Sequence, residues 1–295
     1  MKGRIEAMTS PKYLTARSVN EAVSLLSEYG GKARLVSGAT DFLMQLKRDE
    51  AKPECLIRLG EIRELNFIKQ DETGGLRVGA LTTIVEVANS PLIRRKFSIL
   101  AQAAGMLGTP AIRNQATLGG NLCNAAPSAD TAPPLLVLGA KAKMIGREGE
   151  KIVPLEDFFV GPGQTLLGQD HLLAEIQVPN VPAYSGGAYL KQKRRRGADL
   201  AVVGVAALVV MRGEVLEDVK IALGAVAPTP IRARKAEGIL RGKKLDRPLI
   251  EKSAQSAVSE ASPIDDIRGS AEYRRELLAV LTQRAITQAI QQAEG

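Results

Sequence analysis

The longest apolar stretch of the 295-residue sequence covers eleven residues, from Ala201 to Met211. A helix that crosses a membrane needs about 20 apolar residues, so this stretch is too short to be one. It must instead be buried in the core of a folded domain. We therefore predict a long core strand over residues 200–211, followed by a turn at Arg212-Gly213-Glu214.

Helix and strand patterns are mixed along the rest of the chain without regular β-α-β alternation, which favours the α+β class over a doubly wound sheet. The other expected strands cover residues 33–36, 55–59, 76–78, 187–194 and 219–226, with a hairpin turning at 147–150. The expected helices cover residues from Ser18 to Gly30, 42–50, from Ser90-Pro91 to 107, 130–138 and 271–293, and a long loop is expected over 109–121. Pro179 and Pro182 precede a change to long strands and mark the expected domain boundary.

The chain has one histidine, His171, and two cysteines, Cys55 and Cys123. This set cannot supply a structural zinc site or an iron–sulfur cluster, so no metal site is expected. A Ser-His-Asp or Cys-His hydrolase would have to depend on His171 alone. Any reaction that needs a metal or a redox group must therefore depend on a cofactor that the protein binds.

The expected location is the cytoplasm. The first residues, MKGRIEAMTSPKY, contain no apolar segment of the kind found in a signal peptide. Two cysteines 68 positions apart are typical of buried thiols in a reducing compartment.

The net charge of +8 is compatible with nucleic acid, an acidic partner or an anionic ligand. The densest basic stretch holds Lys191, Lys193 and residues 194–196, which are all Arg. Proteins that bind single-stranded nucleic acid combine such charge with aromatic side chains for stacking. Aromatic residues are only 3% of this chain, so nucleic acid is the weaker explanation.

Two glycine-bearing segments are candidates for binding an anion. In Ser37-Gly38-Ala39-Thr40-Asp41, we expect Gly38 to adopt a positive φ that lets backbone N–H groups converge, and Asp41 to cap the next helix. In Thr117-Leu118-Gly119-Gly120-Asn121, adjacent glycines allow close approach to a ligand, and Asn121 offers a donor and an acceptor. The alternatives are a plain strand–turn–helix connection for the first and a hairpin or bulge for the second. Neither matches a Rossmann or P-loop motif.

These two segments resemble the flavin-binding signatures of the molybdenum hydroxylases, in particular the FAD-binding medium subunit of carbon monoxide dehydrogenase and the FAD domain of xanthine dehydrogenase. The resemblance continues through most of the chain with its motifs in order. It covers Phe158-Phe159, Thr165-Leu166, Ile176 to Pro179, Tyr189 to Lys191, Arg194-Arg195, Asp199 to Ala206 and the string from Leu223 to Pro230.

The resemblance implies a two-lobed FAD-binding domain of the PCMH/vanillyl-alcohol-oxidase type over residues 1–182, with lobes at about 1–60 and 61–182. A smaller α+β C-terminal domain would cover 183–295. It also implies an electron-transfer flavoprotein subunit, in which electrons from a molybdopterin centre pass through [2Fe–2S] clusters to FAD and on to NAD, a quinone or another acceptor. The molybdopterin-binding large subunit and the [2Fe–2S] small subunit would be partners, in a dimer of heterotrimers.

The family's binding residues transfer to matching positions here. They are a pyrophosphate cradle of Leu35, Val36, Ser37, Gly38, Ala39, Thr40 and Asp41; the second signature residues Thr117, Gly120 and Asn121; the carboxylate Asp130; and Leu173, which matches a residue near the adenine or the ring. Many relatives have Gly or Asn where Ala39 stands. Covalent FAD in the wider fold uses an early His or Cys. With no His before position 171 and none in either segment, noncovalent FAD is expected, with His171 structural or exposed.

Lys191 matches a family lysine near the pyrimidine edge of the isoalloxazine, where an ammonium would stabilise the reduced flavin. The alternative for this residue is a solvated surface lysine. No residue of this chain is expected to hydroxylate a substrate. Two alternatives to the whole assignment are a stand-alone flavin oxidoreductase of the same fold and a basic nucleic-acid-binding module.

Overall fold

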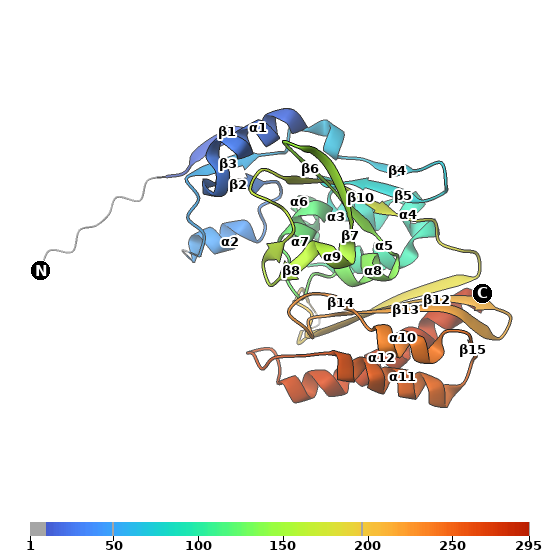
Figure 1. The fold of residues 1–295 in the computed structure, drawn as a ribbon. Coiled ribbons are helices and arrows are strands. Elements are labelled where there is room, and N and C mark those ends of the chain that lie inside the picture. Colours follow the sequence, from blue (N-terminus) through green and yellow to red (C-terminus); the bar gives the residue numbers. More distant parts are fainter. Residues whose placement is uncertain (1–9, 49, 196, 295) are drawn as a thin grey trace, which may run out of the picture.

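The computed structural model describes residues 10–48, 50–195 and 197–294 (Figure 1). Helices are mixed with three main sheets and a small two-stranded one, which confirms the α+β prediction. Residues 1–9, where a signal segment was sought, and Arg196 of the basic stretch lie outside the described residues. Within the described ranges, no helix is long and apolar enough to cross a membrane.

The first sheet is parallel and has three strands in the order β1-β3-β2. Its strands are β1 (Lys12–Thr15), β2 (Ala33–Val36) and β3 (Cys55–Arg58). Helix α1 (Val19–Tyr29), capped by Ser18, buries Ala22 and Leu26 against Ile57 of the sheet. Short helices flank the strands: η1 (Gly30–Lys32), α2 (Phe42–Lys47) and η2 (Arg63–Leu65).

The second sheet is antiparallel, in the order β4-β5-β10-β6-β7. Its strands are β4 (Ile68–Gln70), β5 (Leu76–Gly79), β6 (Lys141–Gly146), β7 (Gly149–Pro154) and β10 (Leu172–Val178). The largest core cluster joins this sheet to α3 (Ile84–Asn89), α4 (Pro91–Lys96), α5 (Ser98–Met106), α8 (Ala132–Val137) and α9 (Leu155–Phe158). Strands β8 (Phe159–Gly161) and β9 (Gln164–Thr165) pair beside it.

Three local predictions in the first two sheets and their helices are wrong. The helix expected from Ser90-Pro91 to 107 is two helices, α4 and α5, because Phe97 leaves the helical conformation between them. The loop expected over 109–121 contains α6 (Pro110–Gln115) and α7 (Leu118–Cys123), because a threonine caps the start of each. Helix α2 ends at Lys47 rather than near residue 50.

The third sheet explains the apolar stretch at 201–211. Its order is β11-β12-β13-β14, with β15 on β13, and the predicted strand is β12. The strands are β11 (Ser185–Gln192), β12 (Val203–Arg212), β13 (Val215–Gly224), β14 (Ile231–Arg232) and β15 (Lys243–Lys244). The helices that follow are α10 (Arg234–Leu240), α11 (Arg247–Glu260) and α12 (Ala271–Glu294).

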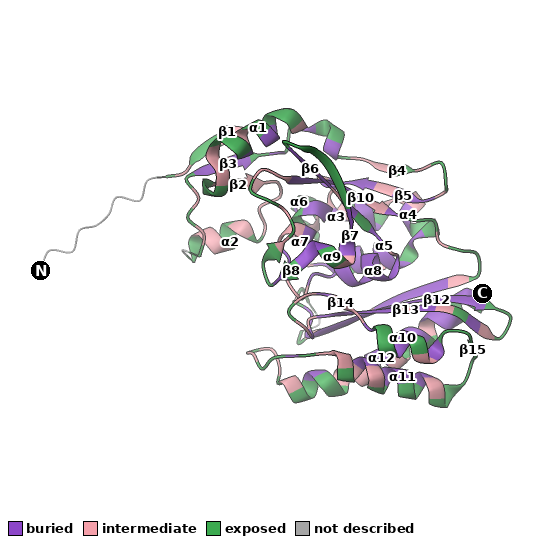
Figure 2. Cartoon of the chain, in the orientation of Figure 1, coloured by how far each residue is buried: buried purple, intermediate pink, exposed green. Residues whose placement is uncertain are grey.

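Both faces of β12 are covered. Ala206 and Leu208 point into the largest cluster, with α8 and the second sheet, whereas Val205 and Val209 point toward α10–α12. Figure 1 shows the helices on either side of this sheet, and Figure 2 shows β12 buried along almost its whole length. A strand buried on both faces reads as a continuous apolar run instead of alternating, as the sequence of β12 does.

Candidate functional site

A cavity of about 1470 Å³ is lined by residues from the first and second sheets, from the helices near them, and from loops next to the third sheet. One wall is the segment from β2 to α2, and another is the start of α7 with the loop before α8. Strand β10 and the loop after β11 complete it. Small-molecule sites usually measure some 300–1,000 Å³, so this cavity suits a large ligand.

The segment from Ser37 to Phe42, which we call the donor loop, presents backbone N–H groups to this cavity. Within the described residues, no hydrogen bond uses the backbone N–H of any residue from Ser37 to Phe42 as donor. Ser37 to Phe42 all line the cavity. Because buried or half-buried N–H groups are rarely left without an acceptor, this row of donors is suited to an anionic or carbonyl-rich ligand.

The glycine of the donor loop has a different role from the one expected. The positive φ lies at Ala39, at +56°, and not at Gly38. A Cβ on Gly38 would instead stand 1.9 Å from the carbonyl oxygen of Gln115 at the end of α6. Gly38 is therefore required for the close approach of the donor loop to α6.

We expect Ala39→Gly to raise the free energy of unfolding by about 1 kcal/mol. A non-glycine residue in the left-handed region costs about 1–2 kcal/mol, and this exceeds the added chain entropy of glycine. Urea unfolding of the full chain measures the change. The matched control is Ala111→Gly in α6, where φ is helical and the same substitution should destabilise. A destabilised Ala39→Gly variant would contradict the strain argument.

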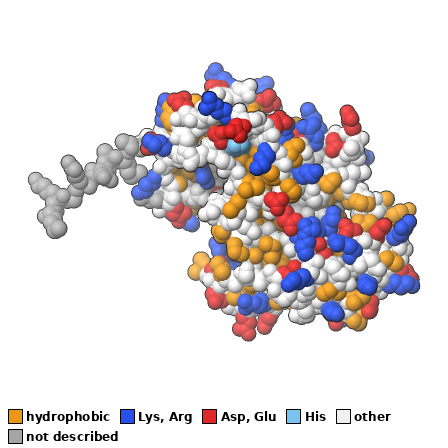
Figure 3. Space-filling view, in the orientation of Figure 1, with side chains coloured by type: hydrophobic (Ala, Val, Ile, Leu, Met, Phe, Trp, Pro, Cys, Tyr) orange, Lys and Arg blue, Asp and Glu red, His pale blue; other side chains and the backbone are white. Residues whose placement is uncertain are grey.

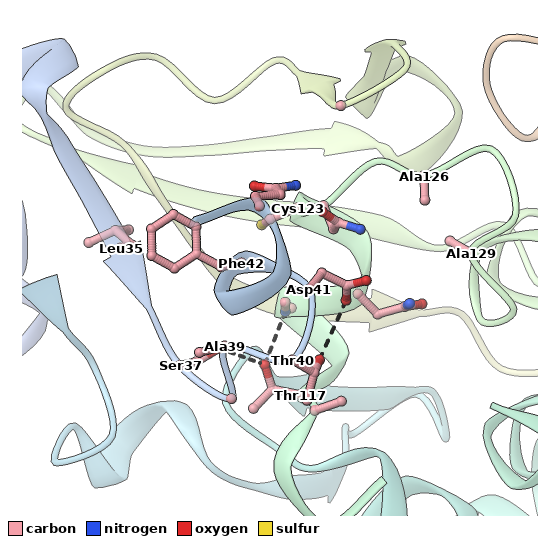
Figure 4. Close-up of a pocket in the computed structure, with 18 of the residues that line it drawn as sticks. Leu35, Ser37, Ala39, Thr40, Asp41, Phe42, Thr117, Cys123, Ala126 and Ala129 are labelled. Carbon is pink, nitrogen blue, oxygen red and sulfur yellow. Dashed lines mark hydrogen bonds between the residues drawn. The ribbon is translucent and has the colours of Figure 1, made fainter. Parts of the chain in front are cut away.

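Asp41 occupies the first position before α2, but its carboxylate does not cap the helix, so that prediction is wrong. The reason is its backbone, which is already helical rather than extended, with φ −90° and ψ −40°. The Thr40 hydroxyl instead approaches the Asp41 carboxylate at 3.4 Å (Figure 4).

In the second segment, Thr117 to Asn121, the backbone N–H groups from Leu118 onward already donate to acceptors within the protein. Thr117 caps α7 by accepting from the Gly120 N–H at 3.0 Å, and the N–H groups of Leu118 and Gly119 donate to backbone carbonyls of residues 82 and 80. This segment is thus the start of a helix and not a hairpin or bulge. Its contribution to the cavity is a wall of small residues, in which Gly120 is exposed.

A hydroxyl pair joins the two segments. Ser37 Oγ lies 3.1 Å from Thr117 Oγ1, and Figure 4 shows the contact between the donor loop and α7. Farther along α7, the Asn121 side-chain carbonyl accepts from the Thr131 hydroxyl at 2.6 Å. Its amide group is left to face the cavity that Asn121 lines, since no described residue accepts from it.

Asp130 forms a buried charge cluster at the cavity wall. One carboxylate oxygen accepts from the Tyr189 hydroxyl at 2.8 Å, and the other accepts from Lys191 Nζ at 2.7 Å. The side chains of Asp130 and Lys191 are 5% and 2% exposed. Burial raises the pKa of Asp130, and Lys191 opposes that rise. Lys191 is therefore not the solvated surface lysine of the alternative reading.

The cavity brings the predicted residues together. Those from Leu35 to Asp41, together with Thr117, Gly120, Asn121, Asp130 and Leu173, all line it. Lys191 is absent from the lining and lies behind Asp130, to which it is bonded.

Several lining residues were missed by sequence reasoning. They include Arg34, Phe42, Ala126, Ala129, Gly163 to Thr165, Ile267 and Arg268. Arg194 and Arg195 of the basic stretch also line it. Of these residues, only Arg34 could have been predicted from the sequence, because it stands one residue before the first signature.

His171 and Cys123 both line the cavity as well. His171 Nδ1 is 2.7 Å from the Asp170 carboxylate, and the ring packs over Gly146. Burial raises the pKa of the Cys123 thiol to about 12, so this side chain is an uncharged apolar group rather than a nucleophile. Among the residues that the structure describes, no group of three or more His, Cys, Asp or Glu side chains could hold a metal ion.

Two family models match the chain. Residues 6–181 match the FAD binding domain in molybdopterin dehydrogenase, and residues 188–289 match the CO dehydrogenase flavoprotein C-terminal domain. The xanthine dehydrogenase FAD-binding subunit of Escherichia coli O157:H7 is 32% identical over 284 residues, which is 96% of this chain and 97% of that one.

Solved structures agree with the sequence matches. Carbon monoxide dehydrogenase from Hydrogenophaga pseudoflava has a chain that is 33% identical with a TM-score of 0.94, covering 96% of this chain and 98% of its own. Quinoline 2-oxidoreductase from Pseudomonas putida 86 has one that is 30% identical with a TM-score of 0.91, covering 98% and 99%.

Proposed function

Since the chain belongs to the family of FAD-binding subunits of molybdenum hydroxylases, and is thus an oxidoreductase flavoprotein subunit, we propose that it binds FAD noncovalently in the 1470 Å³ cavity. The observation that carries this proposal is the donor loop. FAD is an elongated ligand with a diphosphate in its middle, and a row of N–H groups without acceptors suits that diphosphate.

The remaining site residues have proposed roles that follow from their places. Thr117 and Gly120 form a wall beside the donor loop, and the Asn121 amide donates to the ligand. Leu173 supplies an apolar surface for an aromatic ring. Lys191, acting with Asp130, adjusts the electrostatic potential at the isoalloxazine.

Bound FAD would supply the electron-transfer chemistry, and this chain would supply binding, orientation and the surrounding charge. In the proposed route, electrons reach FAD from [2Fe–2S] clusters and leave for NAD, a quinone or another acceptor. A molybdopterin-binding large subunit and a [2Fe–2S] small subunit are the proposed partners, in a dimer of heterotrimers. The medium-chain and FAD-subunit names of the relatives support partners of this kind.

The proposed domains are residues 1–182, with lobes at about 1–60 and 61–182, and residues 183–295. The two family matches end and begin at 181 and 188, which supports a boundary between them. A cytoplasmic location is proposed from the two free cysteines, which are typical of a reducing compartment.

Purification of the chain from its native host tests the proposal. We expect one FAD per chain, released by acid because it is noncovalent, together with molybdenum, iron and two further chains. A flavoprotein that carries no molybdenum and no partner would favour the stand-alone flavin oxidoreductase. Flavin absorbance that stays absent after FAD is added would contradict both flavin assignments.

The nucleic-acid alternative has little support on the surface. On the face drawn in Figure 3, Lys and Arg side chains are interspersed with Asp and Glu side chains. Nucleic-acid-binding domains instead gather basic side chains on one face or along one helix.

A further inference from the structure

Among the residues that the structure describes, Arg34 is a cation at the cavity without a counter-ion. It lines the cavity, and no described residue forms a hydrogen bond or an ion pair with its guanidinium group. Its recorded contact is with the Phe42 ring, whose centroid lies 5.9 Å from Arg34 Cζ. An exposed guanidinium beside an aromatic ring is held in place while its donors stay available.

The strand places this charge beside the donor loop. Side chains alternate along β2, and Leu35 packs against the core of the first sheet, so Arg34 points to the opposite side. On that side lie Phe42, the last residue of the donor loop, and Cys123 of α7. Burial raises the pKa of the Cys123 thiol, and the Arg34 charge lowers that pKa by a smaller amount. Arg34 therefore lies at the cavity, close to Phe42 of the donor loop and to Cys123 of α7.

The other cations of the cavity are already engaged. Three further arginines line it within the described residues: Arg194 donates to the Ile267 carbonyl at 2.7 Å, Arg195 pairs with Asp199 at 3.5 Å, and Arg268 pairs with Asp266 at 3.0 Å. Among these described arginines, Arg34 is thus the one whose guanidinium donors are unused, and it lies next to the donor loop, whose backbone N–H groups are also unused. Two donor sets without acceptors at one place indicate a ligand group that carries full negative charge.

We propose that Arg34 is the ionic contact for the diphosphate of the bound dinucleotide, and that it sets the preference for a phosphorylated flavin. This inference rests on the proposed function. The neutral N–H groups of the donor loop would orient the diphosphate through directional hydrogen bonds, whereas Arg34 would balance its negative charge. A guanidinium suits this role because its planar donors match phosphate oxygens.

The test is equilibrium titration of the flavin-free full chain with FAD and with riboflavin, which lacks phosphate. We expect Arg34→Met to weaken FAD binding about 30-fold and to leave riboflavin affinity within about 2-fold, a range that fits the loss of one charge-assisted hydrogen-bond pair. Arg34→Lys, which keeps the charge, should bind FAD within about 5-fold of the parent chain. Rising salt should weaken FAD binding by the parent more steeply than by Arg34→Met.

The matched control is Lys32→Met, which removes one positive charge two residues away, outside the cavity lining, where Lys32 pairs with Glu54. It should leave FAD affinity unchanged. Unchanged FAD affinity in Arg34→Met would overturn this inference and leave the proposed function standing, as would an equal loss of FAD and riboflavin. Failure of the parent chain to bind any flavin would overturn the proposed function itself.

Discussion

Gly38→Ala is expected to destabilise the chain by about 2–3 kcal/mol and to weaken FAD binding by roughly 30- to 100-fold. The added methyl would stand 1.9 Å from the Gln115 carbonyl oxygen and 2.6 Å from its carbon, and both are backbone atoms that no side-chain rotation can move away. The donor loop must then withdraw from α6, which displaces the row of N–H groups that faces the cavity.

Urea unfolding and FAD titration of the full chain measure the two effects. The matched control is Gly238→Ala in α10, where a Cβ would meet nothing within 4 Å and the backbone is helical. That substitution should stabilise by about 0.5–1 kcal/mol because alanine favours a helix. A Gly38→Ala chain with the parent's stability and FAD affinity would show that the loop is not held against α6 as described.

Lys191→Met should destabilise the chain by about 3 kcal/mol and lower the midpoint potential of bound flavin. The substitution leaves the Asp130 carboxylate buried with only the Tyr189 hydroxyl as donor, which is costly for a charge. An uncompensated negative charge near the flavin also disfavours the more negative, reduced form. Denaturant unfolding and a redox titration give the two quantities.

The pH dependence of this variant has a definite sign. Burial already raises the pKa of Asp130, and the loss of Lys191 raises it further. In the unfolded chain the carboxyl loses its proton near pH 4, so the folded variant binds the proton more tightly. The penalty is therefore full above the folded-state pKa, shrinks as the pH falls below that value, and is absent below the unfolded-state pKa of about 4.

The control for Lys191→Met is the double variant Asp130→Asn/Lys191→Met. It removes both charges and keeps an acceptor for Tyr189, so stability should return to within about 1 kcal/mol of the parent and the pH dependence should vanish. A Lys191→Met chain with an unchanged potential would refute the tuning role. An equally destabilised double variant would show that packing, and not charge, is what Lys191 provides.

Sequence reasoning located the elements that have strong local signals. The strand at Ala33–Val36, the hairpin of β6 and β7 and the final helix lie where predicted, because periodicity and turn residues determine them locally. The break at Phe97 was missed because the apolar pattern continues through it and nothing local marks an interruption. The short helices α6 and α7 were missed because Thr caps and glycines resemble a loop.

The residues of the candidate site could be predicted from the sequence, but their geometry could not. The resemblance named residues that all surround one cavity, except Lys191, which lies behind Asp130. The positive φ at Ala39 and the contact of Gly38 with the Gln115 carbonyl depend on how α6 packs against the donor loop. Arg34 was missed because the availability of its guanidinium depends on which of the described side chains pack near it, and this is a property of the tertiary structure.

The burial of the third sheet on both faces limits how far the chain can be divided. Ala206, Leu208 and Ala222 form one continuous core with α5, α8 and the second sheet, so the sheet is a shared wall. A fragment that ended at residue 182 would lose this wall and expose the apolar side of α8. The flavin-binding part is therefore not a detachable module, and fusion or shuffling of these subunits should keep residues 10–294 as one unit.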